Sequence, residues 1–361
     1  MLSEKELLSR TITFLRLPLI IGVVFIHTNL TSVMLAGECW VTEGQFPIHD
    51  IIRHLLTGEF ACIAVPLFFF MSGFLFFTHT EFTFSAYKKK LGRRLHTLLI
   101  PYLFWNLLVL LLFFLAQSLL STMTSGTGKL IVDYTFTDWL RVFWNQIDGM
   151  PMCYQFWFIR DLMVVALFSP LVYWFIRYFK VYGVVLLGAL WSLGIWNDIA
   201  GFSGVAFFFF TFGSWFAVNQ HNFVTDFKPL RTSFTLLYLL IVIINTILWY
   251  KQSEMFEFMH SLGIIVGLIA VVGWTAYGIQ KGKLKCNALL AGCSFFIYAY
   301  HAMPLAFLMK LCSKVLHPVT ELTMILAYLF IPFIIVGTGI GIYVLMQKCL
   351  PRFTSFITGG R

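Results

Sequence analysis

Long runs of apolar residues, separated by short polar segments, recur along the whole chain. Each run has about 20 residues, the length that an α-helix needs to cross a hydrocarbon core of roughly 30 Å. The pattern predicts ten such helices, with approximate spans 12–30, 51–77, 96–118, 156–177, 181–197, 201–218, 233–250, 260–279, 289–310 and 322–347. We therefore expect an all-α polytopic membrane protein, a bundle of about ten transmembrane helices.

The segments between these runs are mostly short, and none is long enough to fold as a separate soluble domain. Residues 1–361 are therefore expected to form a single integral membrane domain. The longest extracytoplasmic loop, 119–155, opens with STMTSGTG and later contains DWLRVFWNQI, whose apolar residues recur at helical spacing. This predicts a short amphipathic helix at the outer surface, which either anchors the loop in the interface or caps a site.

The composition agrees with a membrane location, because 59% of the residues are hydrophobic and only 11% are charged. If the N-terminus is cytoplasmic, 17 of the 25 Lys and Arg residues lie on the cytoplasmic side, as the positive-inside rule requires. Both termini are therefore expected in the cytoplasm. The same asymmetry accounts for most of the net charge of +9, so no nucleic-acid partner is expected. The first helix has no small-residue cleavage site after it, and we expect it to be retained.

The first predicted helix, FLRLPLIIGVVFIHTNL, contains an arginine and a histidine in an otherwise apolar run. Arg16 and His27 are eleven residues apart, which on an α-helix places them on one face and roughly 16 Å apart along the axis. Ionisable groups at membrane depth are costly unless they face a partner or a cavity, so this face is interpreted as functional. Alternatively, Arg16 extends its head group to the cytoplasmic interface and His27 bonds a neighbouring helix.

Several segments together resemble a known family of membrane proteins. They are Arg-x10-His in the first helix, VPLFFFMSGFLFF (65–77), KKKLGRRLHTLLIPYLFWNLL (88–108), FWFIRDLMVVALFSPLVYWF (156–175) and SFFIYAYHAMPL (294–305). In this order, and over essentially the whole chain, they resemble the acyltransferase 3 family of integral membrane acyltransferases, bacterial members of which O-acylate glycans.

The resemblance implies that His27 is the catalytic histidine and that Arg16 helps to hold the acyl donor. This agrees with the chemistry, because a neutral imidazole can take a proton from an acceptor hydroxyl that attacks a thioester. Transient acylation of His27 as a nucleophile is an open alternative. The donor that the family implies is acyl-CoA, with acetyl-CoA as the expected form.

A basic cluster in KKKLGRR is suited to the phosphates of such a donor. It contains Lys90, Arg93 and Arg94 among five basic residues in seven positions, and guanidinium groups bind phosphate well. Arg94 is favoured because it lies closest to the following apolar run. The alternative is that the cluster only marks the cytoplasmic side of the membrane.

Other residues are candidates for lining a substrate pocket. Ser72 offers a hydroxyl in the SGF motif, although Gly73 beside it favours a role in close helix packing. Tyr298 and His301 lie in FIYAYHAMPL, where His301 reaches a depth comparable to that of His27 and could line the same cavity. A histidine satisfied within the bundle is the alternative for His301.

Charged and aromatic residues near the outer helix ends complete the candidate set. Trp157, Arg160 and Asp161 open the fourth predicted helix. Because neighbours at i and i+1 do not face each other on a helix, we expect Arg160 and Asp161 to have different partners. Asp161 or Glu59 could orient the imidazole of His27, as the carboxylate of a catalytic triad does. An ordinary position at the membrane interface is the alternative for both.

The sequence thus predicts a multi-pass protein of the bacterial cytoplasmic (inner) membrane. It would move an acyl group, expected to be acetyl, from cytoplasmic acyl-CoA to a hydroxyl of a cell-envelope glycan or lipid-linked saccharide. No metal is expected, because the seven cysteines are scattered without a C-x-x-C pair or a histidine at metal-binding spacing. The chain ends soon after the last predicted helix, so no appended extracytoplasmic domain is expected.

Two other classes of function are compatible with a polytopic helical bundle. A transporter or flippase for a glycan or lipid could use the same ionisable residues as a relay, although the chain has no internal repeat of the kind that many transporters show. A catalytically inactive partner in polysaccharide assembly would keep the bundle and lose the site. The presence of both Arg16 and His27 argues against that partner role.

Overall fold

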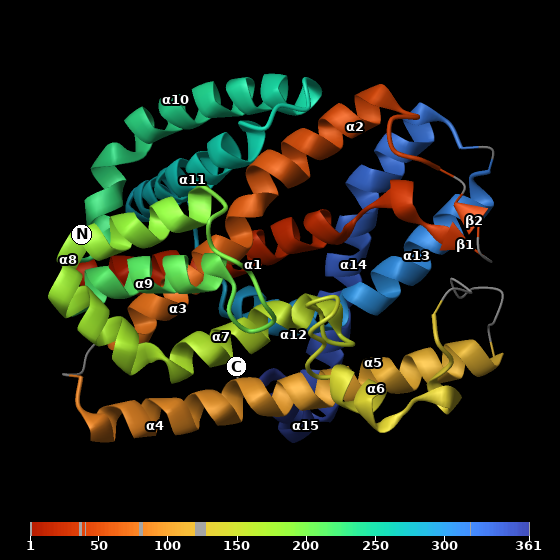
Figure 1. Cartoon of the computed structure of the whole chain (residues 1–361), viewed down its shortest axis with the longest axis horizontal. Helices are drawn as coiled ribbons and strands as arrows, with labels where there is room; N and C mark the ends of the chain where they lie inside the picture. The colour runs from red at the N-terminus through yellow and green to blue at the C-terminus, as the bar shows by residue number, and fades with distance from the viewer. Residues whose placement is uncertain are drawn as a thin grey trace. The chain divides into compact units, whose positions relative to one another are not determined.

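The protein is almost entirely helical over the residues that the computed structural model describes, which are 2–35, 38–39, 41–78, 82–119, 128–317 and 319–360. The α-helices (Figure 1) are α1 (Glu4–His27), α2 (Pro47–Arg53), α3 (Ala64–Phe77), α4 (Phe84–Arg94), α5 (Ile100–Leu119), α6 (Phe136–Arg141), α7 (Trp157–Leu167), α8 (Ser169–Ser192), α9 (Gly204–Val218), α10 (Phe223–Tyr250), α11 (Phe256–Gln280), α12 (Ala288–Tyr300), α13 (Ala302–Val315), α14 (Glu321–Cys349) and α15 (Pro351–Thr358). Short 3-10 segments occupy Leu30–Ser32, Ala61–Ile63, Ile131–Asp133 and Tyr154–Phe156, and π-helical turns occupy His54–Phe60 and Leu95–Leu99. Two very short strands, β1 (Met34–Leu35) and β2 (Glu38–Cys39), pair antiparallel.

The helical fold class is confirmed, but the count of ten membrane spans is not. Seven helical stretches of the described chain are long and apolar enough to cross a bilayer, namely Glu4–His27, Pro47–Phe77, Phe84–Leu119, Ser169–Ser192, Phe223–Tyr250, Phe256–Gln280 and Glu321–Cys349. An eighth exists if α12 and α13, which meet at a bend of 65°, form one span. The cytoplasmic location of the termini stays a prediction.

The difference from ten spans arises in the middle of the chain. The segment 156–177, predicted as one span, contains parts of two helices. α7 ends at Leu167, and α8 begins at Ser169 and continues to Ser192. α8 is interrupted at Lys180, whose backbone is not helical (φ 54°, ψ −138°). α9 has 15 residues, which make about 22 Å of helix and fall short of a typical hydrocarbon core.

The chain divides into two compact units, each made of three separate stretches. Unit 1 comprises Met1–Leu19, Glu59–His96 and Arg160–Ala291, and unit 2 comprises Ile20–Gly58, Thr97–Ile159 and Gly292–Arg361. Helix α1 contributes to both units, because it runs without interruption from Glu4 to His27. The organisation of the chain as a single domain stays a prediction.

In unit 1, α3 and α9 pack with closely approaching backbones. A Cβ atom on Gly73 would overlap the carbonyl oxygen of Phe210, and one on Gly213 would overlap the carbonyl oxygen of Phe70. Small residues of this kind let membrane helices come close enough for extensive van der Waals contact. The ring of Phe70 also packs edge-on against Phe223, with centroids 5.0 Å apart. The interpretation of Gly73 as a packing residue is confirmed.

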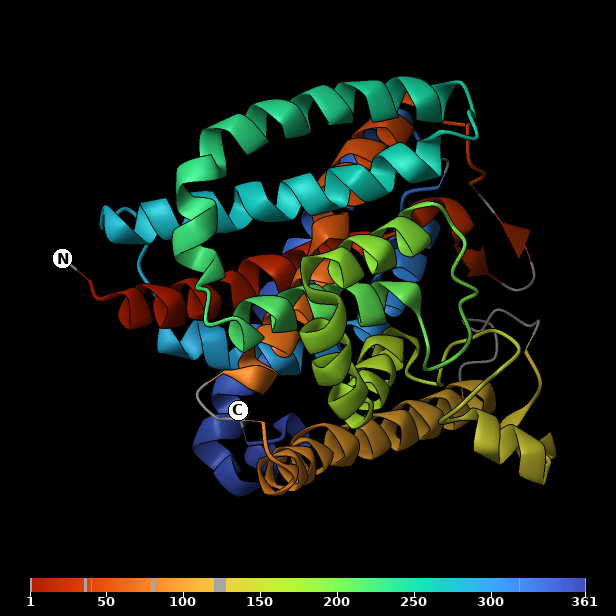
Figure 2. The same cartoon turned by 60° about the vertical axis from the view of Figure 1, so that its left-hand side comes forward.

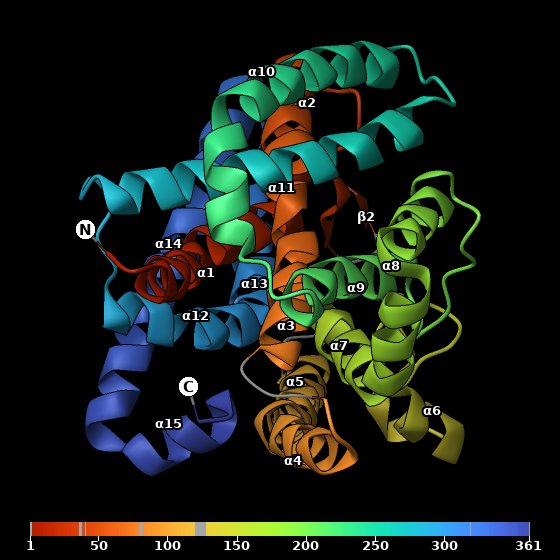
Figure 3. The same cartoon turned by 90° about the vertical axis from the view of Figure 1, so that its left-hand side faces the viewer.

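Also in unit 1, α10 and α11 lie side by side over most of their length (Figures 1 and 2). Figure 3 shows that α10 bends near its beginning, where Pro229 lies inside the helix. Proline lacks an amide donor and clashes with the preceding turn, which bends a helix. Two contacts join the pair: Arg231 lies over the ring of Tyr277 at 4.2 Å, and Trp274 Nε1 donates to Thr235 Oγ1 at 2.9 Å.

In unit 2, hydrogen bonds connect helices that are distant in sequence. Trp105 Nε1 of α5 donates to the carbonyl oxygen of Ile357 in α15 at 3.0 Å. The backbone amide of Ile48 in α2 donates to the carboxylate of Glu321 in the first turn of α14 at 2.6 Å. The Trp105 bond satisfies a buried polar group that would be costly to leave unpaired at membrane depth. The exposed Ile48 bond connects the start of α2 to the start of α14.

The helix predicted from DWLRVFWNQI in the 119–155 loop is present only in part, as α6, which ends at Arg141 and covers the first four of those residues. Its first turn has a capping box, in which the Thr135 side chain accepts from the Asp138 amide and the Asp138 carboxylate accepts from the Thr135 amide. Trp139 and Leu140 are exposed, as expected of a helix at an interface, although its position at the membrane surface stays a prediction. Residues 120–127 lie outside the described residues, and they include all of STMTSGTG (121–128) except its last glycine.

Candidate functional site

His27, the last residue of α1, lies among aromatic and imidazole rings within unit 2. The ring of His301 stacks on it with centroids 5.3 Å apart and an interplanar angle of 28°. The ring of Tyr154 meets it edge-on, with centroids 5.0 Å apart. The structure therefore brings together two residues that the sequence indicated, His27 and His301, and adds Tyr154, which it did not.

His301 is completely buried at the bend between α12 and α13. Its Nδ1 lies 2.7 Å from the carbonyl oxygen of Tyr298, one of the last carbonyls of α12, which have no partner within their own helix. Because a carbonyl oxygen can only accept, Nδ1 carries the proton and Nε2 of the neutral ring is an acceptor. Nε2 is buried and has no hydrogen-bond partner among the described residues, so it can accept from a substrate hydroxyl.

Tyr154 is held in place by hydrogen bonds to the end of α12. The hydroxyl of Tyr298 donates to the carbonyl oxygen of Gln155 at 2.5 Å, and Gln155 Nε2 donates to the carbonyl oxygen of Ala299 at 3.1 Å. These bonds tie the 3-10 turn that contains Tyr154 to the helix end that precedes His301. One network therefore positions both rings that contact His27.

We expect Tyr298→Phe to weaken this network. Removing the hydroxyl leaves the buried carbonyl of Gln155 without its donor, which costs about 1–3 kcal/mol of stability. Thermal unfolding in detergent should shift to lower temperature, and kcat should fall more than KM rises, because Tyr154 loses its support. Tyr300→Phe is the matched control, since that hydroxyl makes only a long contact of 3.5 Å, to Thr338, within the described part of the chain. Equal behaviour of the two variants would contradict the positioning role of Tyr298.

The chain that leads into the 3-10 turn is anchored to α5. Asn106 is completely buried; its Oδ1 accepts from the amide of Cys153 at 2.8 Å, while its Nδ2 donates to the carbonyl oxygen of Tyr102 at 2.8 Å. An amide side chain that satisfies both a donor and an acceptor fixes the position of the backbone that it binds. Asn106 therefore sets where Tyr154 begins its turn beside His27.

Two elements hold the end of α1: the π-helical turn His54–Phe60, which follows α2, and α14. Thr57 Oγ1 lies 3.3 Å from the carbonyl oxygen of Phe25 and 2.7 Å from the hydroxyl of Tyr328. The rings of Phe25 and Tyr328 pack edge-on, with centroids 5.7 Å apart. Aromatic and hydrogen-bonded contacts of this kind restrain the turn that carries His27.

Arg16 lies on the same helix as His27, as predicted. α1 is continuous from Glu4 to His27 and has Pro18 inside it, so the two side chains are roughly 16 Å apart along the axis. Arg16 is half-buried and lies in the stretch of α1 that belongs to unit 1. The helix thus carries a cation at one depth and an imidazole at another.

The predicted basic residues lie on α4 in unit 1. Lys90 Nζ donates to the carbonyl oxygen of Phe76 at 2.5 Å, so it satisfies the C-terminal end of α3. Arg93 is exposed, and Arg94, the last residue of α4, is half-buried before the π-helical turn Leu95–Leu99. Lys90 therefore has a structural partner, whereas the two arginines are better placed for an anion.

Comparison with known proteins identifies the family. The profile of the acyltransferase-domain family matches residues 10–346. The chain belongs to the acyltransferase 3 family. The succinoglycan biosynthesis protein ExoH of Rhizobium meliloti (strain 1021) is 24% identical over 361 residues, a match that covers 98% of this chain and 92% of that protein. No solved structure matches the chain.

Family membership decides between the functional classes that the sequence left open. The protein is an acyltransferase that transfers groups other than aminoacyl groups, and the match favours this activity over a transporter or an inactive partner. Its helices make it a multi-pass membrane protein. Among the described residues of the acyltransferase, no group of three His, Cys, Asp or Glu side chains could hold a metal ion.

Arg160 and Asp161 of the acyltransferase bind each other, so the prediction of separate partners is wrong. Arg160 Nε and Nη2 donate to Asp161 Oδ1 at 2.9 and 2.8 Å, and both side chains are buried. The long side chain of Arg160 folds back to Asp161. The rule that residues i and i+1 point in different directions on a helix does not allow for this. The same Oδ1 accepts from the amide of Gly201 at 3.1 Å, so the pair holds the segment before α9.

Glu59 contacts three residues of unit 1 of the acyltransferase. Asn245 Nδ2 donates to Glu59 Oε2 at 3.2 Å, and His260 Nδ1 lies 4.0 Å from Oε1. The hydroxyl of Tyr238 donates to the backbone carbonyl of Glu59 at 2.5 Å. These contacts connect the π-helical turn before α3 to α10 and α11. Orientation of His27 by either Glu59 or Asp161 stays a prediction.

The remaining candidates occupy ordinary helix positions in the acyltransferase. Ser72 is half-buried in α3 beside Gly73, and Trp157 is the first residue of α7. Sequence reasoning missed Tyr154, Gln155 and Asn106. The one available signal was that Tyr154 and Gln155 directly precede the FWFIRD segment, which carried part of the family resemblance.

Proposed function

We propose that the protein is an O-acyltransferase of the bacterial inner membrane, which moves an acyl group, with acetyl as the expected group, from cytoplasmic acyl-CoA to a hydroxyl of a cell-envelope glycan or lipid-linked saccharide. The observation that carries the proposal is the contact of His27 with His301 and Tyr154 at the end of the helix that also bears Arg16. The relative named for succinoglycan biosynthesis supports a saccharide as the acceptor.

In this mechanism His27 is the general base. It takes the proton of the acceptor hydroxyl while the hydroxyl oxygen attacks the carbonyl carbon of the thioester. A carbon–oxygen bond forms and the carbon–sulfur bond breaks, so that the CoA thiolate leaves and recovers the proton from the imidazolium. Nε2 of His301, buried and without a partner in the described chain, accepts a hydrogen bond from the acceptor and orients it beside His27.

Arg16 and Arg94 are assigned to the anionic donor. Guanidinium groups bind phosphate oxygens in a bidentate manner and keep their charge even when partly buried. The roughly 16 Å between Arg16 and His27 along α1 suits an extended arm that carries a thioester at its end. The donor head group would thus bind at the cytoplasmic end of α1, and the thioester would reach His27.

Sidedness of donor use tests this arrangement. Purified protein is reconstituted in sealed vesicles, and the exposed side of each population is found by protease cleavage of an N-terminal tag. We expect acetyl-CoA to be consumed when it is supplied on the side of the N-terminus, and acyl transfer to fall at least tenfold when it is confined to the other side. Vesicles opened with detergent give the total activity. Equal use from both sides, or use from the opposite side alone, would contradict the assignment of Arg16.

A further inference from the structure

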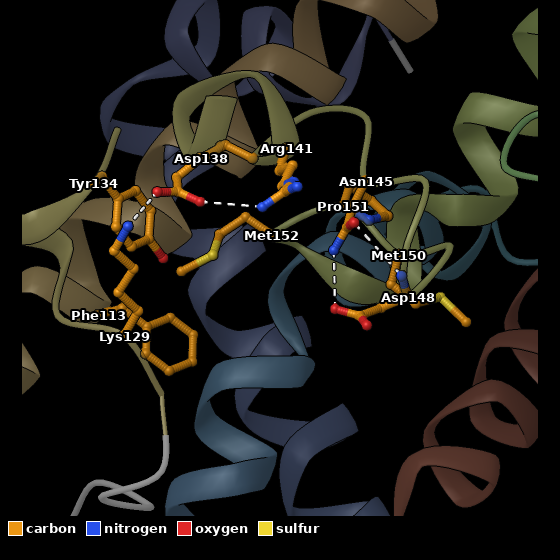
Figure 4. Close-up of a pocket in the computed structure, with 11 residues that line it drawn as sticks. Phe113, Lys129, Tyr134, Asp138, Arg141, Asn145, Asp148, Met150, Pro151 and Met152 are labelled. Atoms are coloured by element: carbon orange, nitrogen blue, oxygen red, sulfur yellow. Dashed lines mark hydrogen bonds and ion pairs between the residues drawn. The ribbon is translucent and has the colours of Figure 1, made fainter. Parts of the chain in front are cut away.

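A cavity lies within unit 2, between α5 and the loop that connects α5 to α7 (Figure 4). We call it the loop cavity; Phe113 and residues of the segment 129–152 line it, and its volume is about 350 Å³. This volume falls near the lower end of the range of about 300–1,000 Å³ that is typical of small-molecule sites. The loop cavity can therefore hold a short piece of a larger ligand.

Charged side chains of the loop cavity balance one another. Asp138 accepts from Lys129 at 2.5 Å and from Arg141 at 3.3 Å, while Asn145 Nδ2 donates to Asp148 at 2.9 Å. Hydrogen bonds from Lys129 and Thr135 hold the pKa of Asp138 well below its usual range, so this carboxylate is ionised at neutral pH. With two cations and two carboxylates the lining is close to neutral, which does not suit a donor that carries several phosphates.

The polar groups of the loop cavity form two clusters, with Met152 between them and the rings of Phe113 and Tyr134 beside Lys129 (Figure 4). Figure 4 shows Asp138 with Lys129 and Arg141 in one cluster, and Asn145 with Asp148 in the other. Carboxylates, amides and guanidinium groups bind hydroxyls through directional hydrogen bonds. The rings of Phe113 and Tyr134 also line the cavity and can pack against the polarised C–H groups of a sugar.

The lining continues directly to the candidate catalytic histidine. Met152 lines the loop cavity, and its amide is bonded to the carbonyl oxygen of Val142 at 2.8 Å. Two residues later, Tyr154 contacts His27. Two residues of chain span at most about 7 Å, and the amide of Cys153 between them is fixed by Asn106. At most about 7 Å of backbone therefore separates Met152, which lines the loop cavity, from Tyr154, which contacts His27.

We propose that the loop cavity is the acceptor subsite and that it binds an uncharged sugar residue of the acceptor next to the hydroxyl that is acylated. This rests on the proposed function, because it supplies that function with a binding site for its second substrate. Asn145, Asp148 and Arg141 recognise the sugar hydroxyls. The segment from Met152 to Tyr154 connects the lining of the loop cavity to the ring that contacts His27.

Direct binding tests the proposal without any need for catalysis. The full chain in nanodiscs is titrated with a panel of neutral oligosaccharides, including cello-oligosaccharides, and binding is followed by saturation-transfer NMR. We expect at least one of these uncharged sugars to bind, and Asn145→Ala combined with Asp148→Asn to raise its Kd at least tenfold. Asp226→Asn is the matched control, because that exposed carboxylate pairs with His221 in unit 1. An unchanged Kd in the double variant, or no binding of any sugar, would overturn the proposal.

A second measurement separates this proposal from the proposed function. The KM for the saccharide and the KM for acetyl-CoA are compared in intact protein and in the double variant; only the saccharide KM should rise. Sugar binding that depends on Asn145 and Asp148 without any acyl transfer would refute the proposed activity and leave the subsite in place. Acyl transfer with the same saccharide KM in the double variant as in the intact protein would refute the acceptor subsite and leave the proposed activity in place.

Discussion

His27→Ala is expected to lower kcat for acyl transfer about 10³-fold, within the range of about 10²–10⁴ that a positioned general base contributes. The acceptor hydroxyl then loses the group that takes its proton, since Nε2 of His301 is assigned to orienting the acceptor and not to removing that proton. The KM for the donor should change little, because Arg16 is untouched. Initial rates with labelled acetyl-CoA in nanodiscs measure both quantities.

A folded control makes the His27 result interpretable. His221→Ala removes an exposed histidine that pairs with Asp226, and it should keep the kcat of the intact chain. Both variants must elute as single species in size-exclusion chromatography and unfold at similar temperatures. A correctly folded His27→Ala protein that loses less than tenfold in kcat would show that another group accepts the proton.

Gly213→Ala should have the largest effect on stability. The added Cβ would overlap the carbonyl oxygen of Phe70 on α3, and the reciprocal contact of Gly73 with Phe210 leaves the two backbones no direction in which to relax. Overpacking of a tight interface costs about 1–3 kcal/mol and occasionally more; we expect the upper end, about 3 kcal/mol. Thermal unfolding and the yield of folded protein in detergent check this result.

The matched control for that substitution lies in α14. A Cβ on Gly337 would meet nothing within 4 Å, so Gly337→Ala should be neutral or should stabilise the helix by about 0.5 kcal/mol through the lower flexibility of alanine. If Gly213→Ala and Gly337→Ala unfolded at the same temperature, this result would contradict the close backbone contact between α3 and α9.

The features that sequence predicted best are those set by local periodicity. The apolar run around Arg16 and His27 predicted a helix that carries both residues, because a bilayer demands an unbroken hydrogen-bonded backbone. The depth argument for His301 placed it level with His27, and the two rings are in contact. The predicted break between 177 and 181 coincides with the non-helical backbone of Lys180.

The features that sequence missed depend on contacts between distant segments. Tyr154 reaches His27 only because Asn106 and Tyr298 fix the 3-10 turn from two different helices, and no linear pattern encodes that meeting. Arg160 and Asp161 were assigned separate partners because ideal helix geometry ignores how far an arginine side chain can fold back. Acceptor recognition likewise depends on a cavity assembled from one helix and a folded loop.

The most direct test of acyl transfer by His27 follows the acyl group itself. Acetyl-CoA labelled in the acetyl group is incubated with the intact chain in nanodiscs and with the host's own envelope polysaccharide, and alkali-labile label on the polysaccharide is counted. We expect ester-linked label with the intact protein and background label with His27→Ala. Equal label with the two proteins, or none with acetyl-CoA and other acyl-CoA donors, would contradict it.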